Sequence, residues 1–168
     1  MTASRPEEMQ RHYSNYLIRE RHADEPVPYN LLLLADPSPE QIDTYLPDSR
    51  IYLLEVEGRI VGIGVWQIYE SGAGEVLNLA VAADHQNKGF GKAMLQAIIV
   101  AARQSSVQRL LIATGNSSIG QIALYQQQGF DLIDIDRDYF VRLYPEPIWE
   151  NGIQCRHQLI FQKRLSHT

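Results

Sequence analysis

The order of the expected elements predicts an α/β (α+β) fold, in which a mixed, mostly antiparallel central sheet carries helices on both faces. Three observations lead there: a hairpin of apolar strands over residues 50–57 and 59–69, a strand-loop-helix unit over 75–103, and a strand-helix-strand succession over 109–135. The 168 residues are most simply one domain, 1–168.

Proline, glycine and capping residues mark the N-terminal elements. Ser38 can cap a short helix that has Pro39 at its first position and ends at Pro47. Gly58 provides the tight turn of the hairpin, and residues 72–74 form the loop into the central strand. The segments expected before them are a polar arm at residues 1–15, an edge strand at 16–19, a proline-broken linker at 24–28 and a buried strand in the apolar run 31–34.

Two helices are expected from the helical spacing of apolar residues. The first runs over residues 89–103, and the second over 119–128 with Gly129 in the left-handed position after its end. The apolar face of the first helix consists of Met94, Leu95, Ile98, Ile99 and Ala102. The remaining strands are expected at residues 75–83, 109–114, 131–135 and 156–163.

Composition restricts the compartment and the partners. A net charge of -5 argues against a nucleic-acid surface. Cys155 is the only cysteine, so no internal disulfide can form, and we expect a small buried side chain there. No apolar run approaches the ~20 residues of a membrane span, so we expect no membrane partner and a cytoplasmic protein. His85 lacks a second histidine at ligand spacing, and no metal is expected.

The stretch from Leu79 to Gly91 carries the strongest functional signal, because an apolar strand runs through a glycine-bearing turn into a helix. Such a helix start presents backbone N–H groups and a partial positive charge, which together bind anions such as phosphate. Two familiar phosphate loops do not fit. A P-loop fails at Gln86 and Ala93, and the dinucleotide fingerprint fails at Met94.

The hexapeptide Gln86-Asn87-Lys88-Gly89-Phe90-Gly91 resembles the acyl-coenzyme A signature of the GCN5-related N-acetyltransferases (GNAT), here of a bacterial type. The likeness extends over roughly residues 31–165, since the element order also fits that family. It implies acetyl-CoA as cofactor and fourth and fifth strands that splay apart, with the pantetheine arm between them. The cofactor-binding residues it implies are Leu79, Ala80, Val81, Gln86, Asn87, Lys88, Gly89, Phe90, Gly91 and Lys92.

The resemblance also implies a catalytic acid. Tyr125 stands four residues before Gly129-Phe130, where the family carries a tyrosine close to the cofactor sulfur. The alternative is an aromatic side chain that only packs against the sheet. The asparagine common in the family before this tyrosine is replaced by Ser118, and Asn116 lies two residues earlier, so either of them is a candidate for the cofactor.

Glu75 is the candidate general base. It lies eleven residues before Gln86, as does the base in the histone-acetylating branch of the family that the sequence resembles. Strand alternation places Glu75 on one face with Leu77, Leu79 and Val81. A solvated glutamate at a strand end is the competing interpretation.

The acceptor side is expected near the C-terminal part of the chain. Asp134, Asp136 and Asp138 would share one face of an extended segment, with Tyr139 and Trp149 close by in sequence. Acidic and aromatic side chains suit a cationic amine, and Asp136, Tyr139 and Trp149 are the candidate substrate-binding residues. A solvated edge strand followed by a proline-rich loop is the competing interpretation.

Together these features predict an acetyl-CoA-dependent N-acetyltransferase that acetylates a primary amine of a small molecule by direct attack in a ternary complex. A protein or peptide N-acetyltransferase and a non-catalytic acyl-CoA-binding regulatory module are the alternatives. The sequence leaves a homodimer open.

Overall fold

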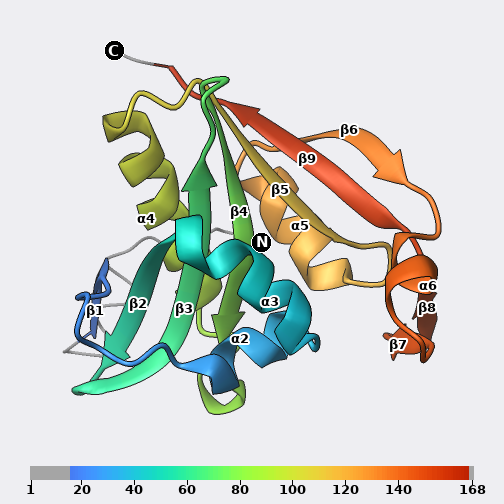
Figure 1. The fold of residues 1–168 in the computed structure, drawn as a ribbon, viewed down its shortest axis with the longest axis horizontal. Coiled ribbons are helices and arrows are strands. Elements are labelled where there is room, and N and C mark those ends of the chain that lie inside the picture. Colours follow the sequence, from blue (N-terminus) through green and yellow to red (C-terminus); the bar gives the residue numbers. More distant parts are fainter. Residues whose placement is uncertain (1–15, 167–168) are drawn as a thin grey trace.

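The structure is a computed structural model that describes residues 16–166 (Figure 1). The expected arm at residues 1–15 lies outside the described residues. The N-terminal half contains β1 (Tyr16–Glu20), α2 (Tyr29–Ala35), α3 (Pro39–Tyr45), the 3-10 turn η1 (Leu46–Asp48), β2 (Arg50–Val56), β3 (Arg59–Ile68) and β4 (Ala73–Val81). The C-terminal half contains η2 (Ala83–His85), α4 (Phe90–Gln104), β5 (Arg109–Gly115), α5 (Ile119–Gln127), β6 (Asp131–Asp136), α6 (Tyr139–Leu143), β7 (Ile148–Glu150), β8 (Ile153–Cys155) and β9 (Gln158–Arg164).

Seven strands form one sheet in the order β1-β2-β3-β4-β5-β9-β6, and β7 and β8 form a separate hairpin. Neighbouring strands of the large sheet run antiparallel except for the parallel pair β4 and β5. Helices α4 and α5 lie on one face, while α2 and α3 lie on the other (Figure 1). This arrangement confirms the predicted fold class.

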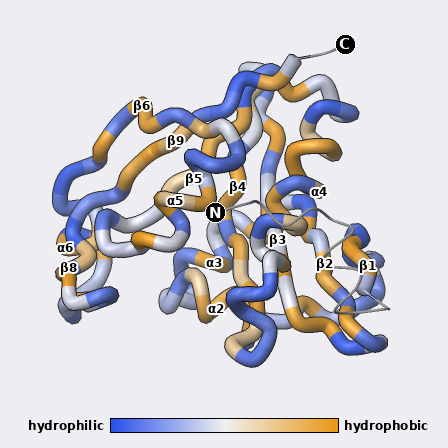
Figure 2. The backbone as a smooth tube through the Cα atoms, turned by 180° about the vertical axis from the view of Figure 1, so that it is seen from behind, coloured by the Kyte–Doolittle hydropathy of each residue, from blue (hydrophilic) through white to orange (hydrophobic). Residues whose placement is uncertain are grey.

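Each face of the sheet has its own core. The cluster under α4 and α5 includes Trp66, Met94, Ile98 and Phe161, which are each at most 1% exposed. The cluster under α2 and α3 is smaller. The buried side of α4 includes all five residues of its predicted apolar face, so periodicity located this helix correctly. Along β6, hydrophobic and hydrophilic stretches alternate, as suits a strand at the sheet edge (Figure 2).

The predicted strand at residues 31–34 is wrong, because these residues belong to the helix α2. Leu31 and Leu32 are 3% and 0% exposed, whereas Leu33 and Leu34 are 39% and 55% exposed. A run of four apolar residues fits a strand or a helix equally well, so periodicity could not decide. Packing decides here, since the Asn78 amide of β4 donates to the Leu32 carbonyl at 3.0 Å.

Several further boundaries differ from the expectations, most of them by one or two residues. β4 begins at Ala73, inside the predicted loop, and ends at Val81, before η2. The segment expected as a proline-rich loop after β6 contains α6 and the β7–β8 hairpin.

Cys155 is buried, as expected. Within residues 16–166 every helix is too short or too polar to cross a bilayer.

Candidate active site

The sheet opens between β4 and β5. These strands pair only from Ala73 to Val76 with Arg109 to Ile112, and beyond that point they diverge (Figure 1). The outer edges of both strands are occupied, since β3 pairs with β4 and β9 pairs with β5. The result is a V-shaped opening. On its β4 side, backbone groups beyond Val76 form no hydrogen bonds with β5.

The backbone of Leu79 and Val81 faces this opening. The Ala82 N–H donates to the Val61 carbonyl at 2.7 Å, which fixes which residues of β4 bond to β3. In an antiparallel ladder alternate residues bond to the same neighbour, so Ala80 also faces β3 and its two neighbours face β5. The Ala80 side chain lies in the core under α2. Of the three predicted pantetheine contacts, the backbone geometry therefore favours Leu79 and Val81.

The predicted anion cradle lies at the end of β4. Asn87 and Gly89 have φ angles of 60° and 83°, so the chain turns sharply before α4 begins. The Ala93 N–H donates to the Gly89 carbonyl at 3.0 Å, and the N–H groups that precede it point out of the helix start toward the loop. A helix start of this kind attracts a diphosphate.

Side chains also shape the cradle. The Gln86 amide donates to the Val81 carbonyl at 2.8 Å and so ties the loop to the opening. The Lys88 ammonium donates to the Asp84 carbonyl at 3.1 Å, and the side chain of Phe90 is buried in the core. A Cβ on Gly91 would meet nothing closer than Leu124 Cδ2, 4.0 Å away. The protein itself leaves room there, which fits close approach of a ligand to the backbone.

Tyr125 lies on α5, and its ring packs in the core under that helix. Its side chain is 4% exposed, and its ring centroid is 6.3 Å from that of Phe130 and 5.7 Å from that of Phe161. Among residues 16–166 its hydroxyl has no hydrogen-bond partner. Burial raises the pKa of Tyr125 well above its usual range, so the phenol holds its proton at neutral pH. The phenol thus has a proton to offer a departing thiolate, although its raised pKa makes it a weaker acid than a free tyrosine.

Glu75 lies on the opposite face of the sheet, and the predicted strand face is wrong. A β-bulge at Leu77 shifts the register, since Trp66 pairs with Val76 but Val65 pairs with Asn78. Glu75 pairs with Gln67, whose side chain reaches the Tyr45 carbonyl beside α3. The Glu75 carboxylate accepts a hydrogen bond of 2.6 Å from the Tyr69 hydroxyl. Glu75 therefore shares a face with Asn78, not with Leu79 and Val81.

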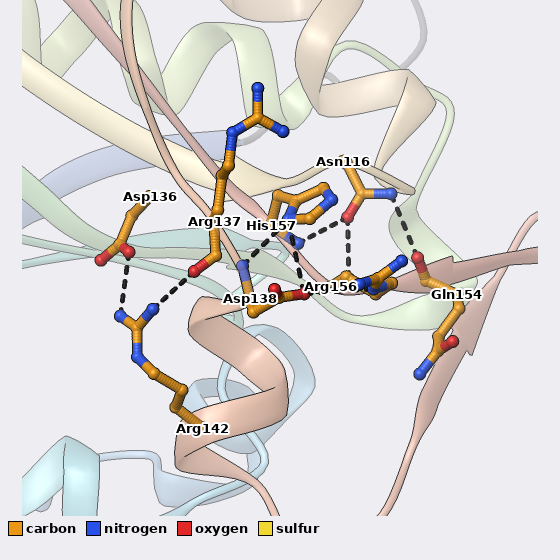
Figure 3. Close-up of polar contacts among 8 residues, drawn as sticks. All are labelled: Asn116, Asp136, Arg137, Asp138, Arg142, Gln154, Arg156 and His157. Atoms are coloured by element: carbon orange, nitrogen blue, oxygen red, sulfur yellow. Dashed lines mark hydrogen bonds and ion pairs between the residues drawn. The ribbon is translucent and has the colours of Figure 1, made fainter.

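Asn116 and Ser118 hold the C-terminal segment in place, and Figure 3 shows the contacts of Asn116. The Asn116 side chain donates to the Gln154 carbonyl at 3.1 Å and accepts from the backbone N–H groups of Arg156 and His157 at 2.8 and 2.9 Å. The Ser118 hydroxyl donates to the Glu150 carboxylate at 2.6 Å. Either side chain would have to exchange these bonds to reach a cofactor.

The acidic face predicted at Asp134, Asp136 and Asp138 is only partly correct. Asp138 has a φ angle of 56° and precedes α6, so it leaves the strand. Asp136 and Asp138 are paired with Arg142 and Arg156 at 2.9 and 2.8 Å (Figure 3). Trp149 lies on the β7–β8 hairpin and is 66% exposed.

Of the three candidate substrate-binding residues, Tyr139 is the one that lies within range of the charge of Asp36. It is half-buried at the start of α6, and burial followed by the charge of Asp36 raises its pKa. Asp36 and Tyr144 meet across the same region, since the Tyr144 hydroxyl donates to the Asp36 carboxylate at 2.9 Å. Sequence reasoning missed Asp36, because it follows a segment that was assigned to a strand.

Asn78 was missed as well. It is 4% exposed on β4, and its amide donates to the Leu32 carbonyl and to the Tyr45 hydroxyl at 3.0 and 3.1 Å. The sequence did contain a signal for this residue, because a single amide side chain within an apolar strand usually needs hydrogen-bond partners in the core.

Comparison with known proteins shows the family. Residues 9–130 match the model of the Acetyltransferase (GNAT) family, and the chain belongs to that family. An uncharacterized N-acetyltransferase of Bacillus subtilis (strain 168), YvbK, is 43% identical over 128 residues, which cover 76% of this chain and 83% of the relative. The predicted family membership is thus confirmed.

Two solved structures are similar over most of the chain. A GNAT family acetyltransferase from Elizabethkingia anophelis with acetyl-CoA bound is 43% identical, with a TM-score of 0.87 over 90% of this chain and 99% of its own. The IAA acetyltransferase from Bacillus cereus ATCC 14579 is 39% identical, with a TM-score of 0.86 over 90% of this chain and 100% of its own.

Proposed function

We propose that the protein is an acetyl-CoA-dependent N-acetyltransferase that acetylates a primary amine of a small molecule by direct attack in a ternary complex. One observation carries this proposal. Tyr125 packs in the core under α4 and α5, whereas the carboxylate of Glu75 lies on the other face of the sheet, one residue before the last residue of β4 that pairs with β5. A cofactor and an amine can therefore approach one point from opposite sides.

The residues present fit acetyl-CoA. The loop and helix start at residues 86–92 would hold the diphosphate, and the backbone of Leu79 and Val81 would bond the amides of the pantetheine arm. Bound acetyl-CoA supplies a thioester, which accepts the amine at its carbonyl carbon. The Val81 N–H would stabilise the negative charge that develops on the thioester oxygen. The Elizabethkingia relative was solved with acetyl-CoA bound.

Two side chains would move protons. Glu75 would take the proton of the attacking amine directly or through one water, as the new C–N bond forms and the C–S bond breaks. Tyr125 would give its phenolic proton to the departing thiolate. The Tyr69 hydroxyl, which donates to Glu75 at 2.6 Å, would fix the orientation of that carboxylate. We include Tyr139 in the acceptor site. We leave out Asp136, which is paired with Arg142, and Trp149, whose side chain is exposed to solvent.

The test is the release of free thiol from acetyl-CoA with pooled polyamines, aminoglycosides, amino acids and peptides, with a no-amine control subtracted. IAA is assayed in a separate reaction, after the Bacillus cereus relative. Amine-dependent release supports the transferase, and splitting the pool identifies the acceptor. Release only with peptides would favour the peptide N-acetyltransferase. No release from a sample that binds acetyl-CoA would favour the binding module.

Glu75→Gln isolates the base, with Glu70→Gln as the matched control, because Glu70 is an exposed glutamate on the neighbouring turn. Glu75→Gln is expected to lower kcat by about 100-fold at neutral pH and to remove the acid limb of the pH-rate profile. Glu70→Gln should behave as the unmodified protein does. An unchanged profile in Glu75→Gln would show that Glu75 is not the base.

A further inference from the structure

The described chain leaves two half-buried carboxylates without a cation. Of the six half-buried Asp and Glu residues between 16 and 166, four are paired with arginine: Glu25 and Glu55 with Arg19, Asp136 with Arg142, and Asp138 with Arg156. The other two are Asp36 and Glu75, and neither forms an ion pair with any residue in that range. Partial burial of an uncompensated negative charge is unfavourable, so both carboxylates favour a cation from outside the chain.

Tyr144 contacts Asp36, and Tyr45 and Tyr139 lie within range of its charge. Its carboxylate accepts from the Tyr144 hydroxyl at 2.9 Å and from the Ser38 N–H at 3.0 Å. The pKa of Tyr45 is raised to about 12. Burial is the main cause, and the charge of Asp36 contributes. Tyrosine rings beside a carboxylate form the usual setting for an ammonium group, because both the ring face and the charge attract it.

Tyr139 lies within range of the charges of both Asp36 and Glu75. Burial is the main cause of its raised pKa, and the charges of Asp36, Asp136 and Glu75 add to it. The two uncompensated carboxylates therefore act on the same tyrosine, from the α2 side and from β4. Both belong to the face of the sheet that carries α2 and α3, where we expect the acceptor amine.

The buried amide oxygen of Asn78, whose side chain also contacts Tyr45, is an independent sign of a ligand. Asn78 is 4% exposed, and its Oδ1 has no hydrogen-bond donor among the described residues, although its Nδ2 donates to Leu32 and Tyr45. A buried acceptor without a donor is rare in proteins. Asn78 lies two residues beyond the last residue of β4 that pairs with β5, which is where the sheet opens. A substrate N–H would supply the missing donor.

We propose that the acceptor site selects amines that carry a second positive charge, with Asp36 binding the distal ammonium within the rings of Tyr45, Tyr139 and Tyr144. The inference rests on the proposed function and specifies its substrate class. Glu75 would serve the reacting amine, and the Asn78 oxygen would accept one of its N–H groups. Asp36 is in this sense a specificity-determining residue and takes no part in proton transfer.

The experiment compares kcat/KM for putrescine and cadaverine with that for butylamine and pentylamine, which have the same chain lengths but one charge. The diamines should be preferred at least about tenfold, which is the size expected for one charge-assisted contact. Asp36→Asn keeps an oxygen for Ser38 and Tyr144 but removes the charge, and should reduce that preference about tenfold. Asp43→Asn is the matched control, since Asp43 is exposed and accepts from Tyr29 at 2.7 Å. It should keep the preference.

A second readout needs no turnover. With coenzyme A bound, putrescine should raise the Tm of the unmodified protein more than butylamine does, and Asp36→Asn should abolish this difference. Equal treatment of diamines and monoamines in both assays would overturn the proposal while leaving the transferase intact. Absence of thiol release with every acceptor would refute the proposed function instead, and the Tm comparison would still decide whether Asp36 binds a cation.

Discussion

Replacement of Tyr125 by phenylalanine separates the proposed catalytic role of this residue from a packing role. Phenylalanine keeps the ring contacts with Phe130 and Phe161, whose centroids lie 6.3 and 5.7 Å away. The hydroxyl has no hydrogen-bond partner among residues 16–166, so its removal should change the free energy of unfolding by less than about 1 kcal/mol. Stability is therefore expected to change little.

Turnover should change much more. Loss of a general acid typically lowers the rate by about 10²- to 10⁴-fold, and a 100-fold loss corresponds to about 2.7 kcal/mol of transition-state stabilisation. We expect kcat for thiol release to fall at least about 100-fold, while the Kd for acetyl-CoA stays within about threefold.

The assay pairs steady-state thiol release with calorimetric titration of acetyl-CoA and a thermal melt. Tyr52→Phe is the matched control, because Tyr52 is a half-buried tyrosine on β2, which β3 separates from β4, and its ring centroid lies 6.4 Å from that of Trp66. An unchanged kcat in Tyr125→Phe would refute the acid role. A fall in Tm of several degrees together with weaker acetyl-CoA binding would make Tyr125 a packing residue.

Three further predictions concern stability and pH. Gly64→Ala should lower the free energy of unfolding by about 1–3 kcal/mol in urea titrations, because its Cβ would lie 2.8 Å from Ile98 Cδ1 and 3.1 Å from Met94 Cγ; Gly120→Ala, with nothing within 4 Å, should cause no loss. Gly89→Ala should cost about 1–2 kcal/mol through its φ of 83°, whereas Gly91→Ala should not, and equal costs would contradict the strain argument. Hydrogen bonding to Arg19 lowers the pKa of Glu25 from 4.5 to about 2, so its contribution is present above pH 4.5 and is lost as the pH falls toward 2. Glu25→Gln should flatten the decline of the urea midpoint in that window, and an unchanged acid limb would argue against the pairing.

Local sequence signals determined much of the fold and the anion cradle. The spacing of apolar residues identified α4 and its buried face, and the glycines marked the turn of the hairpin and the start of α4. These features depend on backbone conformation and on periodicities within one element, which neighbouring residues define by themselves. The loop at residues 86–91 was accessible for the same reason.

Tertiary contacts decided the rest. Residues 31–34 became helical because α2 packs on β4, and the β-bulge at Leu77 moved Glu75 to the face of Asn78. Asn116 proved to be bound by the backbone of the β8–β9 connection, 38 and more residues away in sequence. Asp36 meets Tyr144 across 108 positions. Contacts between residues so far apart in sequence produce no periodic pattern in the chain. The sequence by itself therefore determined the cradle. Only the folded structure decided which carboxylates face the acceptor side.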